Sequence, residues 1–149
     1  MKAVHKAVIT VFAKKEENES KIKQALISLV PLNLEKEKIK VKQQTATGFR
    51  DKQIRIFKIE LEKTRHANEF VKSLVSKLKP EQKEMLLRQA ESRLDEEFNF
   101  FIRLDKEKLL ENNELYVTDR GNCYHISLSI AAFPSKREKA LETIEKLLK

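Results

Sequence analysis

Residues 123–132 read CYHISLSIAA, and this stretch decides how the chain folds. Apolar side chains fall at every second position from Tyr124 to Ala132, and small or polar ones stand between them from Cys123 to Ala131. Successive side chains of a β-strand point to opposite faces, so the pattern predicts a strand with one apolar and one small polar face. An antiparallel sheet of such strands can leave its second face to solvent or to a partner.

Four further strands are predicted toward the N-terminus of this stretch, at residues 3–13, 36–43, 54–62 and 98–104, and a short one at 115–117. In residues 36–43, Ile39 and Val41 point one way while Lys38, Lys40 and Lys42 point the other. Residues 54–62 have apolar side chains on both faces, which indicates burial on both sides or a bulge.

Helical spacing of apolar residues predicts helices over residues 16–29, from 64 to 78, from 80 to 94 and from 135 to 148. Thr64 is predicted to cap the second helix, Pro80 to lie in the first turn of the third, and Ser135 with Glu138 to form a capping box. The order is β-α-β-β-α-α-β-β-β-α. Because helices and strands do not alternate strictly, we expect one α+β domain over residues 1–149, with a mostly antiparallel sheet and helices on one face.

The charge of the chain is concentrated in residues 36–58, KEKIKVKQQTATGFRDKQIRIFK, which carry eight basic and two acidic side chains. Residues 1–63 have 15 basic and 8 acidic side chains (+7), whereas residues 64–149 have 16 and 15 (+1). A compact basic region on a small domain is typical of proteins that bind a polyanion, most often a nucleic acid. Strand lysines can also serve only to keep a sheet edge from pairing with a neighbour.

If residues 36–43 form a strand, their lysines lie roughly 7 Å apart, close to the phosphate repeat of a single strand. Arg50 and Lys52 flank the following loop, where Phe49 could stack on an unpaired base. Arg103 faces away from the apolar side of its strand, and Asp105 is predicted to cap the following helix. The predicted nucleic-acid contacts are Lys38, Lys40, Lys42, Arg50, Lys52, Arg55, Arg103 and Lys106.

Catalytic and metal-binding patterns are weak in this sequence. Two glycines cannot form a phosphate-binding loop, the three histidines lack helical pairing, and Cys123 is the one cysteine. Cys123 and His125 share a strand face, but no third group is predicted to orient them. We therefore expect a protein that has no enzymatic activity and binds neither a metal nor a cofactor. Short apolar runs and the lack of disulfides lead us to expect a soluble, cytoplasmic protein that crosses no membrane.

Three segments resemble a family of small archaeal RNA-binding proteins, formerly a domain of unknown function and also described as predicted exosome subunits. They are TGFRDKQIRIFKIELEKTRHANEFVKSL at residues 47–74, FIRLDK at residues 101–106, and the helix start at residues 134–140. Two places differ: the family loop reads Gly-Asn-Pro-Ile where Gly48 is followed by Phe49, and Gln-Ala-Ala where Glu107, Lys108 and Leu109 stand.

The resemblance implies one α+β domain that binds RNA without catalysis, forms a homodimer, and acts with an RNA-processing or RNA-degrading complex such as the exosome. The alternative is a protein–protein adaptor whose basic region docks on an acidic partner. A small hydrolase would need a cleft of convergent carboxylates, which the sequence does not predict.

Overall fold

The structure is a computed structural model that describes residues 2–47 and 52–149. Within these residues the elements follow in the order β1 (Val4–Lys14), α1 (Glu19–Ser28), β2 (Val41–Thr47), β3 (Gln53–Leu61), α2 (Thr64–Lys77), α3 (Pro80–Arg88), α4 (Ala90–Arg93), β4 (Asn99–Asp105), α5 (Lys106–Asn112), β5 (Val117–Thr118), β6 (Cys123–Ile130) and α6 (Arg137–Leu148). The strands form one six-stranded sheet in the order β2-β3-β1-β6-β4-β5.

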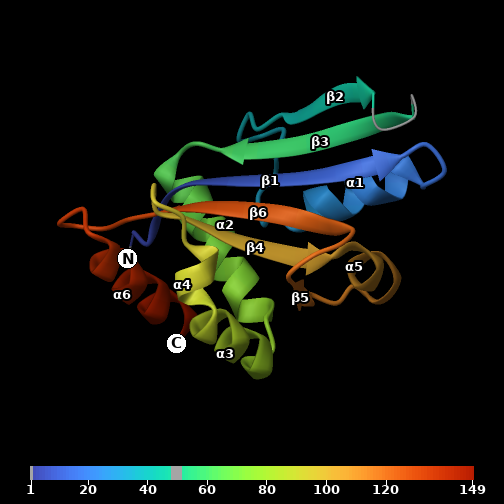
Figure 1. The fold of residues 1–149 in the computed structure, drawn as a ribbon. Helices are drawn as coiled ribbons and strands as arrows, with labels where there is room; N and C mark the ends of the chain where they lie inside the picture. Colours follow the sequence, from blue (N-terminus) through green and yellow to red (C-terminus); the bar gives the residue numbers. More distant parts are fainter. Residues whose placement is uncertain (1, 48–51) are drawn as a thin grey trace.

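Every strand pair in this sheet is antiparallel. The helices lie on one side of it, with α1 and α2 seen behind the strands in Figure 1. Apolar stripes such as Ile22 and Leu26 of α1, and Phe70 and Leu74 of α2, are buried in the same core as the sheet. The predicted α+β class, with a largely antiparallel sheet and helices on one face, is confirmed.

Strand alternation separates two faces of the sheet. In β6, Tyr124, Ile126 and Leu128 have no exposed surface, while the residues between them are half-buried. The buried face continues through neighbouring strands with Ala7, Ile9, Val11, Phe57, Ile59, Leu61, Phe100, Ile102 and Leu104. We call the opposite, helix-free side the open face. It begins at β2 and β3, crosses β1 and β6, and ends at β4 and β5 (Figure 1).

The strand predicted at residues 36–43 is wrong in its first half, because β2 begins only at Val41. Residues 34–38 form a turn in which Asn33 accepts a hydrogen bond from the Lys36 amide at 3.0 Å and Leu34 accepts one from Ile39. Lys38 has φ of 57°, a left-handed conformation that no strand residue adopts. The alternating lysines therefore do not form a row along one strand.

Several other boundaries differ from the predictions. Asn18 caps α1, neither Thr64 nor Ser135 makes a side-chain cap, and the third helix breaks at Gln89 into α3 and α4. The ladders of β3 with β1 and β2 run without a register shift, so β3 has no bulge. None of the helices in the described part of the chain is both long and apolar enough to cross a bilayer.

Candidate nucleic-acid interface

The strand registers align polar and basic residues in one row across the open face. Lys42 pairs with Lys58, Lys58 with Thr10, and Thr10 with His125. His125 then pairs with Arg103, and Arg103 with Thr118. We call this the cross-sheet row: Lys42, Lys58, Thr10, His125, Arg103 and Thr118. Because each pair is directly opposite, neighbouring side chains stand about 5 Å apart at Cβ.

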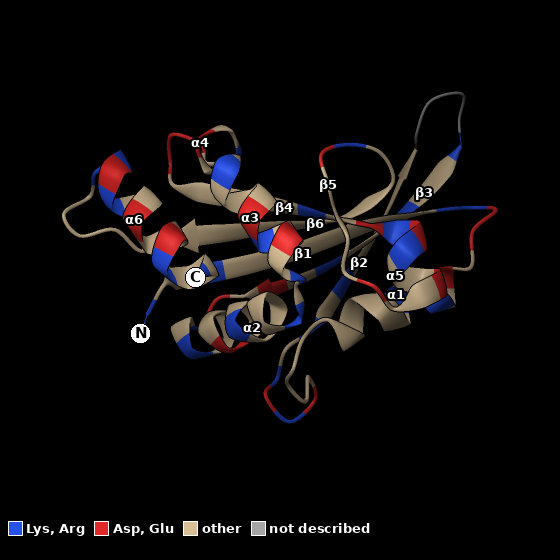
Figure 2. Ribbon diagram, turned by 90° about the horizontal axis from the view of Figure 1, so that it is seen from below, with Lys and Arg blue, Asp and Glu red and all other residues tan. Residues whose placement is uncertain are grey.

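The cross-sheet row carries Lys42 and Lys58 at its β2–β3 end and Arg103 on β4, with the carboxylate of Glu60 close to Lys42. Lys42 lies opposite Lys58, and its Nζ is 3.2 Å from Oε2 of Glu60. The hydrogen bond from Lys42 lowers the pKa of Glu60, so this carboxyl is ionised at neutral pH. Blue segments occur on β2 and β3 in Figure 2, whereas α3 and α6 carry both signs.

The lysines of the turn before β2 gather at the edge of the sheet rather than on a strand. Lys38 and Lys40 are exposed and line a hollow of about 410 Å³. Lys42 and Lys63 also line it, together with the acidic Glu37, Glu60 and Glu62. Its charge is therefore mixed, and Glu60 and Glu62, which lie outside residues 36–58, offset part of the basic excess predicted for that stretch.

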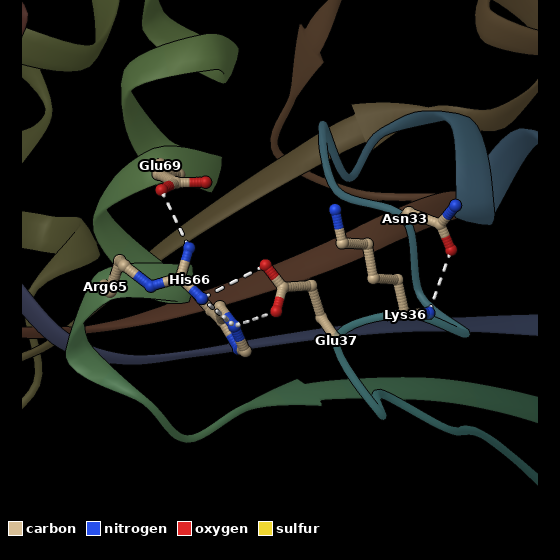
Figure 3. A network of polar contacts seen from close by, with 6 residues as sticks. All are labelled: Asn33, Lys36, Glu37, Arg65, His66 and Glu69. Atoms are coloured by element: carbon tan, nitrogen blue, oxygen red, sulfur yellow. Dashed lines mark hydrogen bonds and ion pairs between the residues drawn. The ribbon is translucent and has the colours of Figure 1, made fainter.

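A polar network ties this turn to α2 (Figure 3). Arg65 donates to Glu37 at 3.1 Å and to Glu69 at 3.2 Å. His66, almost fully buried, has Nε2 at 3.8 Å from Glu37. The Arg65 hydrogen bond lowers the pKa of Glu37. The network fixes the turn that carries Lys38 and Lys40 against the helical layer.

Two other predicted contacts lie at different places. Arg55 pairs with Ala13 and Thr45 on the helix side of the sheet, where its Nε is 3.5 Å from a carboxylate oxygen of Glu19 in α1. Lys52 is exposed directly before β3. Arg50, with Phe49, lies outside the described residues. The structure thus does not place Arg55 with the cross-sheet row.

The prediction of Lys106 as a nucleic-acid contact is wrong, because its side chain is buried. Its ammonium donates to the Phe12 carbonyl and lies 3.3 Å from both carboxylate oxygens of Glu17. Desolvation lowers the pKa of Lys106, although Glu17 opposes that shift. Asp105 caps α5, as predicted, by accepting from the Lys108 amide at 2.9 Å, and Lys106 is the first residue of that helix.

Some residues of the open face were not among the predicted contacts. Lys58 lies within the basic stretch, but its place beside Thr10 depends on strand pairing that the sequence does not give. Phe12 is 53% exposed, although it lies in β1 between the buried Val11 and Ala13. Arg93, buried at the end of α4, donates to the carbonyls of Phe101 and Thr118 and supports the β4 edge.

The geometry of Cys123 and His125 does not indicate a nucleophile. Burial raises the pKa of the Cys123 thiol, whereas a reactive cysteine needs a lowered one. Burial and the Arg103 cation lower the pKa of His125, so its imidazole is neutral at pH 7. Within the described residues no group of three His, Cys, Asp or Glu side chains could hold a metal ion.

The fold and this face define a small α+β protein with one helix-free sheet face crossed by basic and polar side chains. The chain belongs to the family described as RNA binding, which matches residues 6–132. The resemblance seen in the sequence is confirmed by this match.

Relatives of nearly the same length support the assignment. The chain is 26% identical over 144 residues to RNA-binding protein PAB1135 of Pyrococcus abyssi, covering 97% of this chain and 93% of that protein. The crystal structure of protein AF2318 from Archaeglobus fulgidus is similar with a TM-score of 0.83 and 27% identity, covering 97% of this chain and 99% of that one. The structure of Mth689, a DUF54 protein from Methanothermobacter thermautotrophicus, is similar with a TM-score of 0.78 and 26% identity, and the match covers 99% of each chain.

Proposed function

We propose that this protein binds RNA without catalysis, through the β2–β3 end of the open face and the adjoining lysine turn. The observation that carries the proposal is the pairing of Lys42 with Lys58 on a helix-free face. Arg103 extends the same row, Lys38 and Lys40 are exposed in the turn before β2, and Lys52 is exposed at the other end of the β2–β3 hairpin. Arg50 remains a predicted contact that lies outside the described residues.

Like charges set directly opposite each other destabilise a sheet, so such a pair is better explained by an anionic ligand than by folding. A row of cations on a face free of helices can follow a phosphate backbone. We propose no reaction, because burial raises the pKa of the Cys123 thiol in spite of the Arg103 and Lys106 cations, whereas a reactive cysteine has a lowered pKa.

We further propose that the protein acts as an accessory to RNA processing or degradation, as the resemblance to predicted exosome subunits implies. The homodimer implied by the same resemblance stays a prediction. Light scattering at several protein concentrations checks the dimer, and co-purification that persists after nuclease treatment checks the complex. The alternative role, docking on an acidic protein, predicts capture of such a partner that RNA does not displace.

The test is fluorescence anisotropy of a labelled oligoadenylate over a range of salt concentrations. The double variant Lys42→Gln/Lys58→Gln removes two cations of the cross-sheet row. If each contacts one phosphate of a single strand, the slope of log affinity against log salt becomes shallower by about 1.4.

The matched control is Lys72→Gln/Lys146→Gln, which removes the same charge from exposed positions on α2 and α6. It is expected to leave the slope almost unchanged. Equal losses in the two double variants would mean that only net charge matters, and that the β2–β3 end is not the binding site.

A further inference from the structure

The open face has a hollow of about 330 Å³ at the end of β1, beside the turn that leads into β6. It is lined by Thr10, Val11, Phe12, Arg103, Gly121, Asn122, Cys123 and His125. Its volume is at the lower end of the range in which proteins hold small molecules. Thr10, His125 and Arg103 are also members of the cross-sheet row, so the hollow opens directly onto the basic surface.

Aromatic side chains form part of the hollow and its surroundings. Phe12 is 53% exposed, so its ring is accessible to a ligand. The His125 ring lies on the hollow, and its centroid is 5.4 Å from that of Phe101 at an interplanar angle of 37°. Phe101 therefore supports His125 from the β4 side. Phe12 and His125 thus supply two aromatic rings to the lining of the hollow.

The remaining lining groups can form hydrogen bonds to a planar polar ligand. Arg103 supplies guanidinium donors, Asn122 an amide, and Thr10 a hydroxyl. His125 is neutral at pH 7 because burial and Arg103 disfavour its cation, so one ring nitrogen donates and the other accepts. Aromatic rings beside neutral polar groups and one guanidinium suit a nucleobase better than a bare phosphate.

A buried ion pair holds the hollow in shape. The Lys106 ammonium donates to the Phe12 carbonyl and pairs with Glu17, and Glu17 in turn accepts from Asn122 Nδ2 at 3.4 Å. One charged centre thus connects the end of β1, the turn before α1 and the turn before β6. Phe12 and Asn122, on two sides of the hollow, are therefore positioned before any ligand binds.

We propose that this hollow takes one unpaired base of a bound RNA strand, stacked on Phe12 and His125, while the phosphates follow the cations of the cross-sheet row. The inference rests on the proposed function and deepens it, because it makes RNA with unpaired nucleotides the preferred ligand. In a duplex the bases are stacked and paired, so none can enter the hollow without being extruded.

The experiment compares labelled oligoadenylate with the same strand annealed to oligouridylate, at one salt concentration, for the wild type and Phe12→Ala. Base–aromatic stacking accounts for about a fivefold to 150-fold change in affinity when the aromatic residue is replaced by alanine. Phe12→Ala is expected to weaken single-strand binding within that range and to leave duplex binding unchanged. The control is Phe133→Ala, which replaces a 96% exposed phenylalanine outside the hollow and is expected to change neither affinity.

A second readout does not depend on the folding of a variant. An RNA strand with the fluorescent base 2-aminopurine is titrated with the wild-type protein, and stacking on an aromatic ring is expected to quench its emission. In a separate titration, His125→Ala, which removes the second ring that lines the hollow, is expected to reduce the quenching.

Equal wild-type affinity for single strands and duplex, or unchanged single-strand affinity in Phe12→Ala with no quenching, would overturn the base-binding hollow. If Lys42→Gln/Lys58→Gln still weakens binding in that case, the proposed function stands and only the hollow is wrong. Failure of the wild type to bind either RNA would overturn both proposals.

Discussion

Lys42 of β2 stands directly opposite Lys58 of β3, so two ammonium-bearing side chains share one rung of an antiparallel ladder. Like charges in such a pair repel, and opposite charges there stabilise a sheet by about 0.2–1 kcal/mol. Glu60 relieves part of this repulsion through its 3.2 Å contact with Lys42. The Lys58 cation therefore lowers the free energy of unfolding, whereas under the proposed function it raises the affinity for RNA.

Lys58→Glu is expected to change stability and RNA affinity in opposite directions. The new carboxylate faces Lys42, and we expect the free energy of unfolding to rise by about 0.5 kcal/mol in urea denaturation. The same change reverses a cation of the cross-sheet row, and we expect RNA affinity at low salt to fall about tenfold. Lys146→Glu on α6 is the control and should leave RNA affinity nearly unchanged. A variant that is both less stable and equally good at binding RNA would show that the pair has neither effect.

Glu60→Gln is expected to strengthen RNA binding. Glu60 is the carboxylate paired with Lys42, and its lowered pKa keeps it ionised at neutral pH. Its removal leaves the Lys42 charge free to attract phosphate, and one charge at this range corresponds to about a threefold to fivefold gain at low salt. The gain should disappear as salt rises, since surface charges are screened.

Glu84→Gln is the matched comparison for this gain. Glu84 pairs with Arg88 on α3, and both of these side chains are well exposed. The variant has the same net charge as Glu60→Gln but removes a carboxylate from the helical side. An equal gain in both variants would contradict a local role for Glu60.

The periodicity of apolar residues predicted most of the fold, because most strands and helices bury only one of their faces. The alternation in residues 123–132 gave the β6 face pattern, and helical spacing located α2 and α3. It failed at residues 36–40, where Ile39 packs partly against the core from a turn and so imitates a strand residue. Asn33, which accepts from the Lys36 amide, was the signal for that turn.

The candidate site was less predictable because it depends on register. Thr10 and His125 are neighbours only through the pairing of β1 with β6, and local sequence carries no information on that pairing. Lys106 looked like a surface lysine because its neighbours Asp105 and Glu107 are charged. Its burial follows from the cap at Asp105 together with Glu17, a partner far away in the chain.

Glu17→Gln is expected to destabilise the protein more than any other single carboxylate change considered above. Only 2% of the Lys106 side chain is exposed, and without Glu17 its ammonium retains the Phe12 carbonyl as its neutral partner. Breaking one side of a buried ion pair costs about 3 kcal/mol. Glu16→Gln, a neighbouring exposed position, is the control and should change the free energy of unfolding by less than about 0.5 kcal/mol.

The loss of unfolding free energy in Glu17→Gln should become smaller as the pH falls. Burial raises the pKa of Glu17, but the Lys14 amide and the Lys106 cation together lower it further, to below the ordinary value of 4.5. The ionised carboxylate therefore contributes stability above pH 4.5, and this contribution is lost as the pH falls through the lower folded value. Urea denaturation of both proteins between about pH 7 and pH 3 should show their free energies of unfolding converging in acid. A gap that stays constant down to about pH 3 would mean that the carboxylate charge does not contribute to the stability of this centre.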